Sequence, residues 1–284
     1  MFKLTRLALN RTIKKENGFY FVEDSKTAFP SVTTVLSVIN KPFLTHWEKV
    51  KTLDYFKETL QSPFVTMEQV RNEKWLDNLT NDAVKQSTIF RDAAASFGTR
   101  AHDGLFEIFA FLSIIDRFSL VIERLCKENR IISHDEDLAP IVGGFGLWRR
   151  DNPSLRILHT ELVVFSQLYG FAGTVDMVGR LDNKLVVFDW KTSNSIQSEY
   201  ALQVAAYAAA FQESYNERVD EAWIIRFNKT KPQYEARRVL DHRSSFEAFL
   251  GCLSIWRILQ QDLFTDPTIN PPQTPPSTTS TDDQ

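Results

Sequence analysis

The chain has 284 residues, of which 43% are hydrophobic and 24% are charged. That length suits one large domain or two small ones, and the apolar content can fill a core, which excludes a disordered protein. Cys126 and Cys252 are the only cysteines, too few for a four-cysteine zinc or iron–sulfur site. No apolar run reaches the ~18–20 residues that span a bilayer. We therefore expect a soluble intracellular protein with no membrane contact.

The charge of the chain is unevenly distributed. A net charge of −3 argues weakly against a nucleic-acid partner, but residues 1–15 hold five basic residues and no acidic one. A phosphate-facing surface needs such segregated positive charge, and a solvated basic arm or a short targeting sequence has it too. The charge pattern thus leaves the partner open. For localisation we favour the cytoplasm, with the mitochondrial matrix as the alternative.

The first part of the chain predicts a short strand followed by helices. The strand is expected at 19–22. Ser31 is a good N-cap for a helix over 32–39, whose apolar residues have helical spacing, and Asn40 and Pro42 end it. Further helices are predicted over residues 43–60, 67–79, 89–112 and 118–128.

From Arg156 onward the hydrophobic period changes from about 3.6 residues to 2, which is typical of strands. The pattern predicts strands over 157–165, 173–180, 184–190, 223–228 and 234–239, with helices over 198–213 and 242–259. Helices followed by a meander, a helix and more strands predict an α/β (α+β) fold with helices flanking one mixed central sheet.

Three acidic residues are expected to converge on this sheet. If residues 182–183 form the centre of a hairpin, Asp176 lies opposite Asp189. If residues 167–170 form the preceding symmetric loop, Glu161 lies opposite Asp176. The three carboxylates would then form one row, with opposed Cβ atoms ~4.5–5.5 Å apart. Lys191 shares the face of Asp189, and a β-bulge in either hairpin would shift this register.

A row of carboxylates is repulsive, and a divalent cation relieves the repulsion. Hard oxygen ligands suit Mg²⁺ or Mn²⁺. Lys191 beside such a site can orient a water or meet developing negative charge, which indicates metal-assisted phosphodiester hydrolysis. Asp189 and Lys191 could instead form a purely structural ion pair. However, they end a buried apolar strand, where unpaired charge is costly, whereas the similar triplets at 24–26 and 182–184 lie in turn-like stretches.

Several short motifs resemble a known nuclease family. GTVD at 173–176, DWK at 189–191 and QVAAY at 203–207 resemble the RecB-type branch of the PD-(D/E)XK nuclease superfamily. Within that branch, PSVTTVL at 30–36, HTE at 159–161 and VFDWKTS at 187–193 look most like the mitochondrial genome maintenance exonuclease and its bacterial and phage relatives. The likeness runs from about Phe29 to Trp256.

The resemblance implies a role for each matching residue. Asp176 and Asp189 match metal ligands, and Lys191 matches the catalytic lysine. Glu161 matches an acid that supports the metal site. His102, in GTRAHDGLFE, matches a histidine that many RecB-type nucleases place on the metal. Without the resemblance, a lone helical histidine is more often a core or surface residue.

Two further pairs match segments that the family places near its substrate. Gln203 and Tyr207 are one helical turn apart and would help to hold substrate, although a buried polar pair that fastens the helix to the sheet is an equal alternative. Ser31 and Thr33 lie at a helix N-terminus, which suits phosphate binding. An N-cap and a surface threonine would explain them almost as well.

The resemblance also implies an organisation and an activity. It predicts an N-terminal strand and helical region over 1–88 that covers the active site, and a restriction-endonuclease-like PD-(D/E)XK core over 89–260. The proline-rich composition of the end of the chain, with few apolar residues, predicts a disordered acidic tail over 261–284. The expected activity is that of an Mg²⁺- or Mn²⁺-dependent DNA exonuclease acting on single strands or DNA ends in repair, recombination or genome maintenance. The alternatives are a non-catalytic DNA-binding partner and a structure-specific endonuclease or RNase. The subtype with an iron–sulfur cluster is excluded, because it needs four cysteines.

Overall fold

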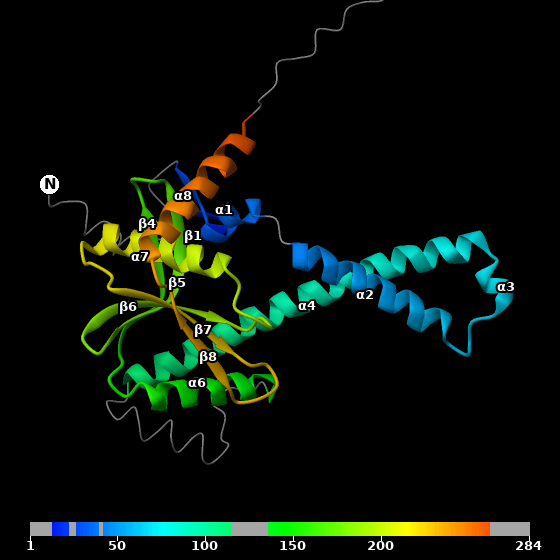
Figure 1. Ribbon diagram of the computed structural model, residues 1–284, viewed down its shortest axis with the longest axis horizontal. Coiled ribbons are helices and arrows are strands. Elements are labelled where there is room, and N and C mark those ends of the chain that lie inside the picture. Colours follow the sequence, from blue (N-terminus) through cyan, green and yellow to red (C-terminus); the bar gives the residue numbers. More distant parts are fainter. Residues whose placement is uncertain (1–12, 23–26, 40–41, 115–135, 262–284) are drawn as a thin grey trace, which may run out of the picture.

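The computed structural model describes residues 13–22, 27–39, 42–114 and 136–261. Its centre is a five-stranded sheet in the order β4-β5-β6-β7-β8, in which only β6 and β7 are parallel neighbours. The strands are β4 (Arg156–Ser166), β5 (Phe171–Leu181), β6 (Lys184–Lys191), β7 (Glu221–Phe227) and β8 (Tyr234–Arg238). The predicted α/β fold with one mixed sheet and flanking helices is confirmed (Figure 1). The predicted helix at 118–128 and most of the expected tail lie outside the described residues.

The parallel pair requires a crossover, and helix α7 (Glu199–Tyr215) supplies it. Its alanines and small neighbours allow close packing on the sheet; Gly173 of β5 is so near Tyr207 that an added Cβ would lie 2.4 Å from its ring. Helix α8 (His242–Leu259) packs on α7, where Phe249 and Leu253 are buried in the same core. Helix α7 therefore lies between α8 and the sheet, in contact with β6.

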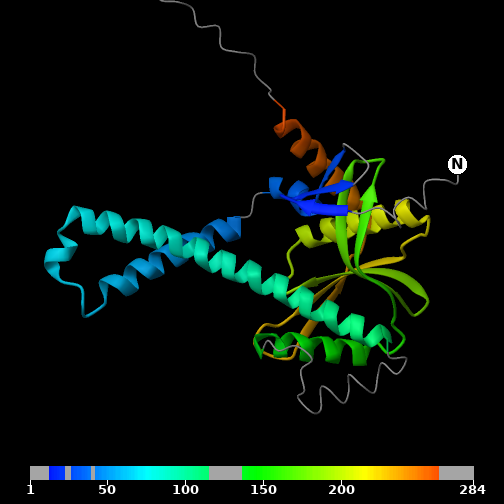
Figure 2. The ribbon, with the colours of Figure 1, turned by 180° about the vertical axis from the view of Figure 1, so that it is seen from behind.

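A second core lies against the sheet under α6 (Ala139–Asp151) and the C-terminal part of α4 (Glu73–Ile114) (Figures 1 and 2). Trp148 contacts Phe188 and Trp190 edge to face, at centroid separations of 5.4 and 5.3 Å. The sequence pattern did not predict α6. Its glycines disfavour a helix locally, but Gly144 lets the helix approach the backbone of Gln233, so tertiary packing overrides propensity.

Helices α2 (Pro42–Leu60) and α3 (Met67–Val70) pack against α4 in an arm that leads away from the sheet (Figures 1 and 2). The predicted helices at 67–79 and 89–112 are wrong in their bounds, because α3 is one short helix and α4 runs without interruption. Residues 80–88 lack apolar periodicity, but they contain no glycine or proline to end a helix. The expected boundary at 88–89 therefore falls inside α4. No described helix is both long and apolar enough to cross a bilayer.

The N-terminal residues form a small antiparallel sheet of β1 (Ile13–Glu16), β2 (Phe19–Val22) and β3 (Ala28–Pro30). The predicted strand at 19–22 is confirmed. Asn17 and Gly18 both have positive φ, as a two-residue hairpin turn requires, so this Asn-Gly pair was the sequence signal for β1. Ser31 caps α1 (Val32–Val35), which continues as the 3₁₀ turn η1 (Leu36–Val38). The Tyr20 hydroxyl joins the small sheet to Thr174 of β5, at 2.8 Å.

We expect Gly173→Ala to destabilise the protein by about 1–3 kcal/mol, because the new methyl group would overlap the Tyr207 ring in a packed core. Urea unfolding would measure the change. Gly251→Ala, on α8, is the matched control, because a Cβ added there meets no neighbouring part of the protein within 4 Å. Alanine is also the better helix former, so stability should rise by up to about 1 kcal/mol. Equal effects of the two substitutions would contradict this packing.

Candidate active site

The predicted strand register is present around the acidic residues. The described pairs Thr160↔Met177 and Leu162↔Val175 flank Glu161 and place it opposite Asp176. Met177 pairs with Phe188, so the next position along each strand sets Asp176 beside Asp189. An irregularity in the β4–β5 ladder lies at residues 157–159, on the far side of Thr160 from Glu161, so it does not move the acidic residues out of register.

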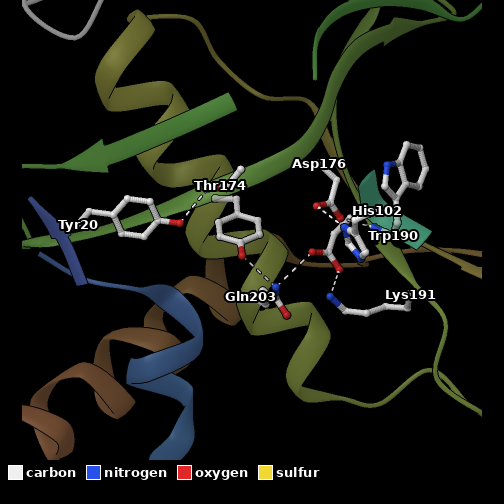
Figure 3. Close-up of polar contacts among 9 residues, drawn as sticks. Tyr20, His102, Thr174, Asp176, Trp190, Lys191 and Gln203 are labelled. Atoms are coloured by element: carbon white, nitrogen blue, oxygen red, sulfur yellow. Dashed lines mark hydrogen bonds and ion pairs between the residues drawn. The ribbon is translucent and has the colours of Figure 1, made fainter. Parts of the chain in front are cut away.

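His102, Glu161 and Asp176 form a compact group in which one ligand atom from each lies within 4.8 Å of the others. The long helix α4 brings His102 to the sheet, and its Nδ1 lies 3.1 Å from Asp176 Oδ1 (Figure 3). The second oxygen of Asp176 accepts a hydrogen bond from the Trp190 backbone N–H at 2.6 Å. Asp176 is therefore held from both α4 and β6.

Glu161 reaches this group from a strained backbone. Its φ is +47°, in the left-handed region that a residue with a side chain seldom adopts, although it lies in the middle of β4. Such a conformation costs roughly 1–3 kcal/mol and persists only where the surroundings impose it. The strain coincides with the one place where β4 contributes a carboxylate to the group.

Asp189, on β6, has partners of its own, Lys191 and Gln203, which Figure 3 labels. One oxygen is 2.5 Å from Lys191 Nζ, and the other accepts a hydrogen bond from Gln203 Nε2 at 3.2 Å. The same Gln203 amide also donates to the Tyr207 hydroxyl, at 2.9 Å. Asp189 is thus linked to Lys191 and, through Gln203, to Tyr207. The carboxylates grouped with His102 are those of Glu161 and Asp176.

Burial makes Glu161 and Asp189 hard to ionise. Burial, with the neighbouring Asp176 charge, raises the pKa of Glu161 to about 7. Burial also raises the pKa of Asp189 to about 6, although Lys191 opposes the shift. The Asp176 charge contributes to both shifts, and this part is the repulsion that the sequence predicted for converging carboxylates.

The two basic groups respond to the same charges. Burial lowers the pKa of Lys191, but the charges of Asp189 and Asp176 raise it by more, so the ammonium is kept protonated. The pKa of His102 is raised as well: burial lowers it, but the charge and the hydrogen bond of Asp176 together raise it by more. Lys191 therefore carries a positive charge at neutral pH.

The donor set fits a divalent cation. A cation placed among His102, Glu161 and Asp176 would offset the burial and the Asp176 repulsion that raise the pKa of Glu161. Carboxylate oxygens suit Mg²⁺ or Mn²⁺, and an imidazole nitrogen favours Mn²⁺ more than an all-oxygen set does.

Ser31 and Thr33 lie at the N-terminus of α1. The Ser31 hydroxyl is buried and accepts a hydrogen bond from the Thr34 backbone N–H at 3.0 Å, which makes it the N-cap. The exposed Thr33 hydroxyl lies 3.0 Å from it. Ser31 is thus engaged in capping, and a role for either residue in phosphate binding stays a prediction.

Sequence reasoning missed one residue that touches the predicted site. The Tyr200 ring, in the first turn of α7, lies 4.9 Å from Lys191 Nζ. Tyr200 and Gln203 are three residues apart and share a helix face, so one face of α7 meets both Lys191 and Asp189. The sequence signal for Tyr200 was its position three residues before Gln203, the first residue of the QVAAY motif, on the same helix face.

A sequence profile described as the PD-(D/E)XK nuclease superfamily matches residues 76–267, more than half of the chain. The chain belongs to this superfamily, and it is therefore a nuclease by family, with nucleic acid as its substrate. Nucleases of this superfamily use divalent metals, and His102, Glu161 and Asp176 form a possible site for one. The closer likeness to the mitochondrial exonuclease stays a prediction. The chain has no match among curated proteins.

Solved structures with some likeness include a protein named SSO0001 and an alkaline exonuclease, LHK-Exo, from Laribacter hongkongensis. The first is 15% identical, with a TM-score of 0.28, over 49% of this chain and 68% of the other. The second is 12% identical, with a TM-score of 0.29, over 51% of this chain and 84% of the other.

We expect the metal-free protein to lose stability as the pH rises. Because the pKa of Glu161 is raised from 4.5 to about 7 on folding, the folded state binds its proton more tightly. The resulting stabilisation is present at low pH and lost as the pH rises through about 7, by up to about 3 kcal/mol. The raised pKa of His102 acts in the same direction.

Thermal unfolding in EDTA between pH 5 and pH 8 would measure this loss. Glu161→Gln should flatten the pH dependence, because glutamine does not titrate. Glu247→Gln, at an exposed position on α8, is the control and should leave it unchanged. If Glu161→Gln kept the wild-type dependence, the electrostatic description of the site would be wrong.

Proposed function

We propose that this nuclease is a metal-dependent DNA exonuclease that acts on single strands or DNA ends, with a role in repair, recombination or genome maintenance. One observation carries the catalytic part of the proposal: a His102, Glu161 and Asp176 ligand group lies beside a buried Asp189–Lys191 ion pair. A site that only bound DNA would have no need for this costly burial of like charges.

His102, Glu161 and Asp176 would hold the cation, with Asp189 beside them. The bound cation supplies Lewis acidity for attack on a phosphodiester. Lys191 contributes a fixed ammonium that can orient an attacking water and stabilise negative charge as it develops on the phosphate. Gln203 holds Asp189 by its amide, and Asp189 in turn holds the lysine, so the position of the charge is set before substrate arrives.

The choice of DNA, and of single strands or ends, rests on the motif resemblance. The segments at 30–36, 159–161 and 187–193 resemble exonucleases of genome maintenance. The positions of two of these segments support the proposal, because HTE carries Glu161 on β4 and VFDWKTS carries Asp189 and Lys191 on β6.

End-labelled single-stranded and duplex DNA should be degraded in Mg²⁺ or Mn²⁺ and left intact in EDTA. Lys191→Met should lower the rate by about 10²-fold or more, because it removes the ammonium while keeping most of the side-chain volume. Lys184→Met, at the other end of β6, is the matched control and should cleave at the wild-type rate.

A circular single strand tests the exonuclease assignment, because it offers no end. It should survive conditions that degrade the linear strand. Cleavage of the circle would instead indicate an endonuclease, and cleavage of RNA but not DNA would indicate an RNase. Binding of DNA without cleavage in either metal would contradict the catalytic proposal and favour a DNA-binding partner.

A further inference from the structure

A second basic group lies on the turn that follows β7, at the end of the sheet where β6 carries Lys191. Lys229 Nζ is 5.1 Å from the ring centroid of Phe97 on α4, and the guanidinium of Arg100 lies 5.6 Å from the same ring. Phe97 is half-buried at the edge of the core under α6. The ring therefore supports the ammonium of Lys229 from the side of the helix.

The environment of Lys229 is unusual for a lysine in a surface turn. The residue is half-buried, and burial lowers the pKa of its ammonium. Among the described residues, no acidic side chain forms an ion pair with it. Arg226, three residues earlier in β7, has such a partner, since its guanidinium donates a hydrogen bond to Glu235 at 3.0 Å. A partly desolvated cation without an acidic partner can be compensated by an anionic ligand.

The strand register places Lys229 beyond the same end of the sheet as Lys191. Strands β6 and β7 are parallel, and Lys191 of β6 pairs with Arg226 of β7. Lys229 follows Arg226 by three residues in the chain. On α4, a Cβ added to Gly98 would lie 3.7 Å from the hydroxyl of Thr192, directly after Lys191. Gly98 adjoins Phe97 and is one turn before His102. The segment 97–102 thus connects Lys229 to the ligand group.

We propose that Lys229, supported by Phe97, is a phosphate-binding residue for the nucleic-acid strand beside the catalytic centre. It contacts a phosphodiester that is not cleaved, and so it holds the strand in place without taking part in the chemistry. The inference rests on the proposed function only in taking nucleic acid as the ligand. Phosphate contacts position a strand without reading its sequence, so the contact should be independent of base composition.

Binding of a fluorescently labelled oligothymidylate of about 20 nucleotides, in EDTA and over a series of salt concentrations, tests the proposal. Each phosphate contact to a single strand adds about 0.7 to the slope of log affinity against log salt. Lys229→Met should lower that slope by about 0.7 and weaken binding at low salt. Lys229→Arg should retain the wild-type slope, because it keeps the charge.

Lys184→Met is the matched control, since this lysine is paired with Glu221 at the far end of β6, and its slope should equal that of the wild type. Lys229→Gln repeats the neutralisation with a polar side chain, in case the methionine variant unfolds. A wild-type slope and affinity in a folded, neutralised variant would overturn the proposal. Failure of the wild type to cleave DNA in either metal, with the Lys229 effect intact, would instead overturn only the proposed exonuclease.

Discussion

The site depends on like charges held together in a low-dielectric interior. Asp176 and Asp189 lie on adjacent strands, with exposures of only 7% and 1%, and Glu161 joins them from the third strand. Burial first, and repulsion by the Asp176 charge second, oppose ionisation of Glu161 and Asp189 and raise the pKa of each. The surrounding structure has to compensate for this cost.

Each nearby element supplies one part of that compensation. Helix α4 contributes the His102 ring to Asp176, and the backbone of β6 contributes the Trp190 N–H. Helix α7 contributes the Gln203 amide to Asp189, and β6 itself supplies the Lys191 ammonium. The aromatic core around Trp148 and the alanine-rich face of α7 keep these elements close to the sheet. The packing that stabilises the fold therefore also sets the positions of the site residues.

The sequence predicted the parts that local rules determine. The register of Glu161, Asp176 and Asp189 followed from two symmetric hairpin loops, because opposed residues in an antiparallel pair are fixed by the loop between them. His102 could be assigned to the metal only through the motif resemblance, since nothing local distinguishes it from another helical histidine. The place of the Glu161 carboxylate in the ligand group, with Asp189 on a separate set of partners, needed the structure.

What the sequence could not predict depends on contacts between distant segments. Helix α6 forms despite its glycines, because those glycines fit against the β7–β8 turn. The continuity of α4 through residues 80–88 has no apolar pattern to signal it. The contact between Phe97 and Lys229 joins residues 132 positions apart in the chain, and no motif links them.

Binding of Mn²⁺, followed by electron paramagnetic resonance, tests the central claim most directly. Wild type and Lys191→Met should both bind the ion, since the lysine is not a ligand, whereas Asp176→Asn should bind it at least tenfold more weakly because it removes a central carboxylate. Equal binding by Asp176→Asn and wild type would contradict a metal centre built on His102, Glu161 and Asp176.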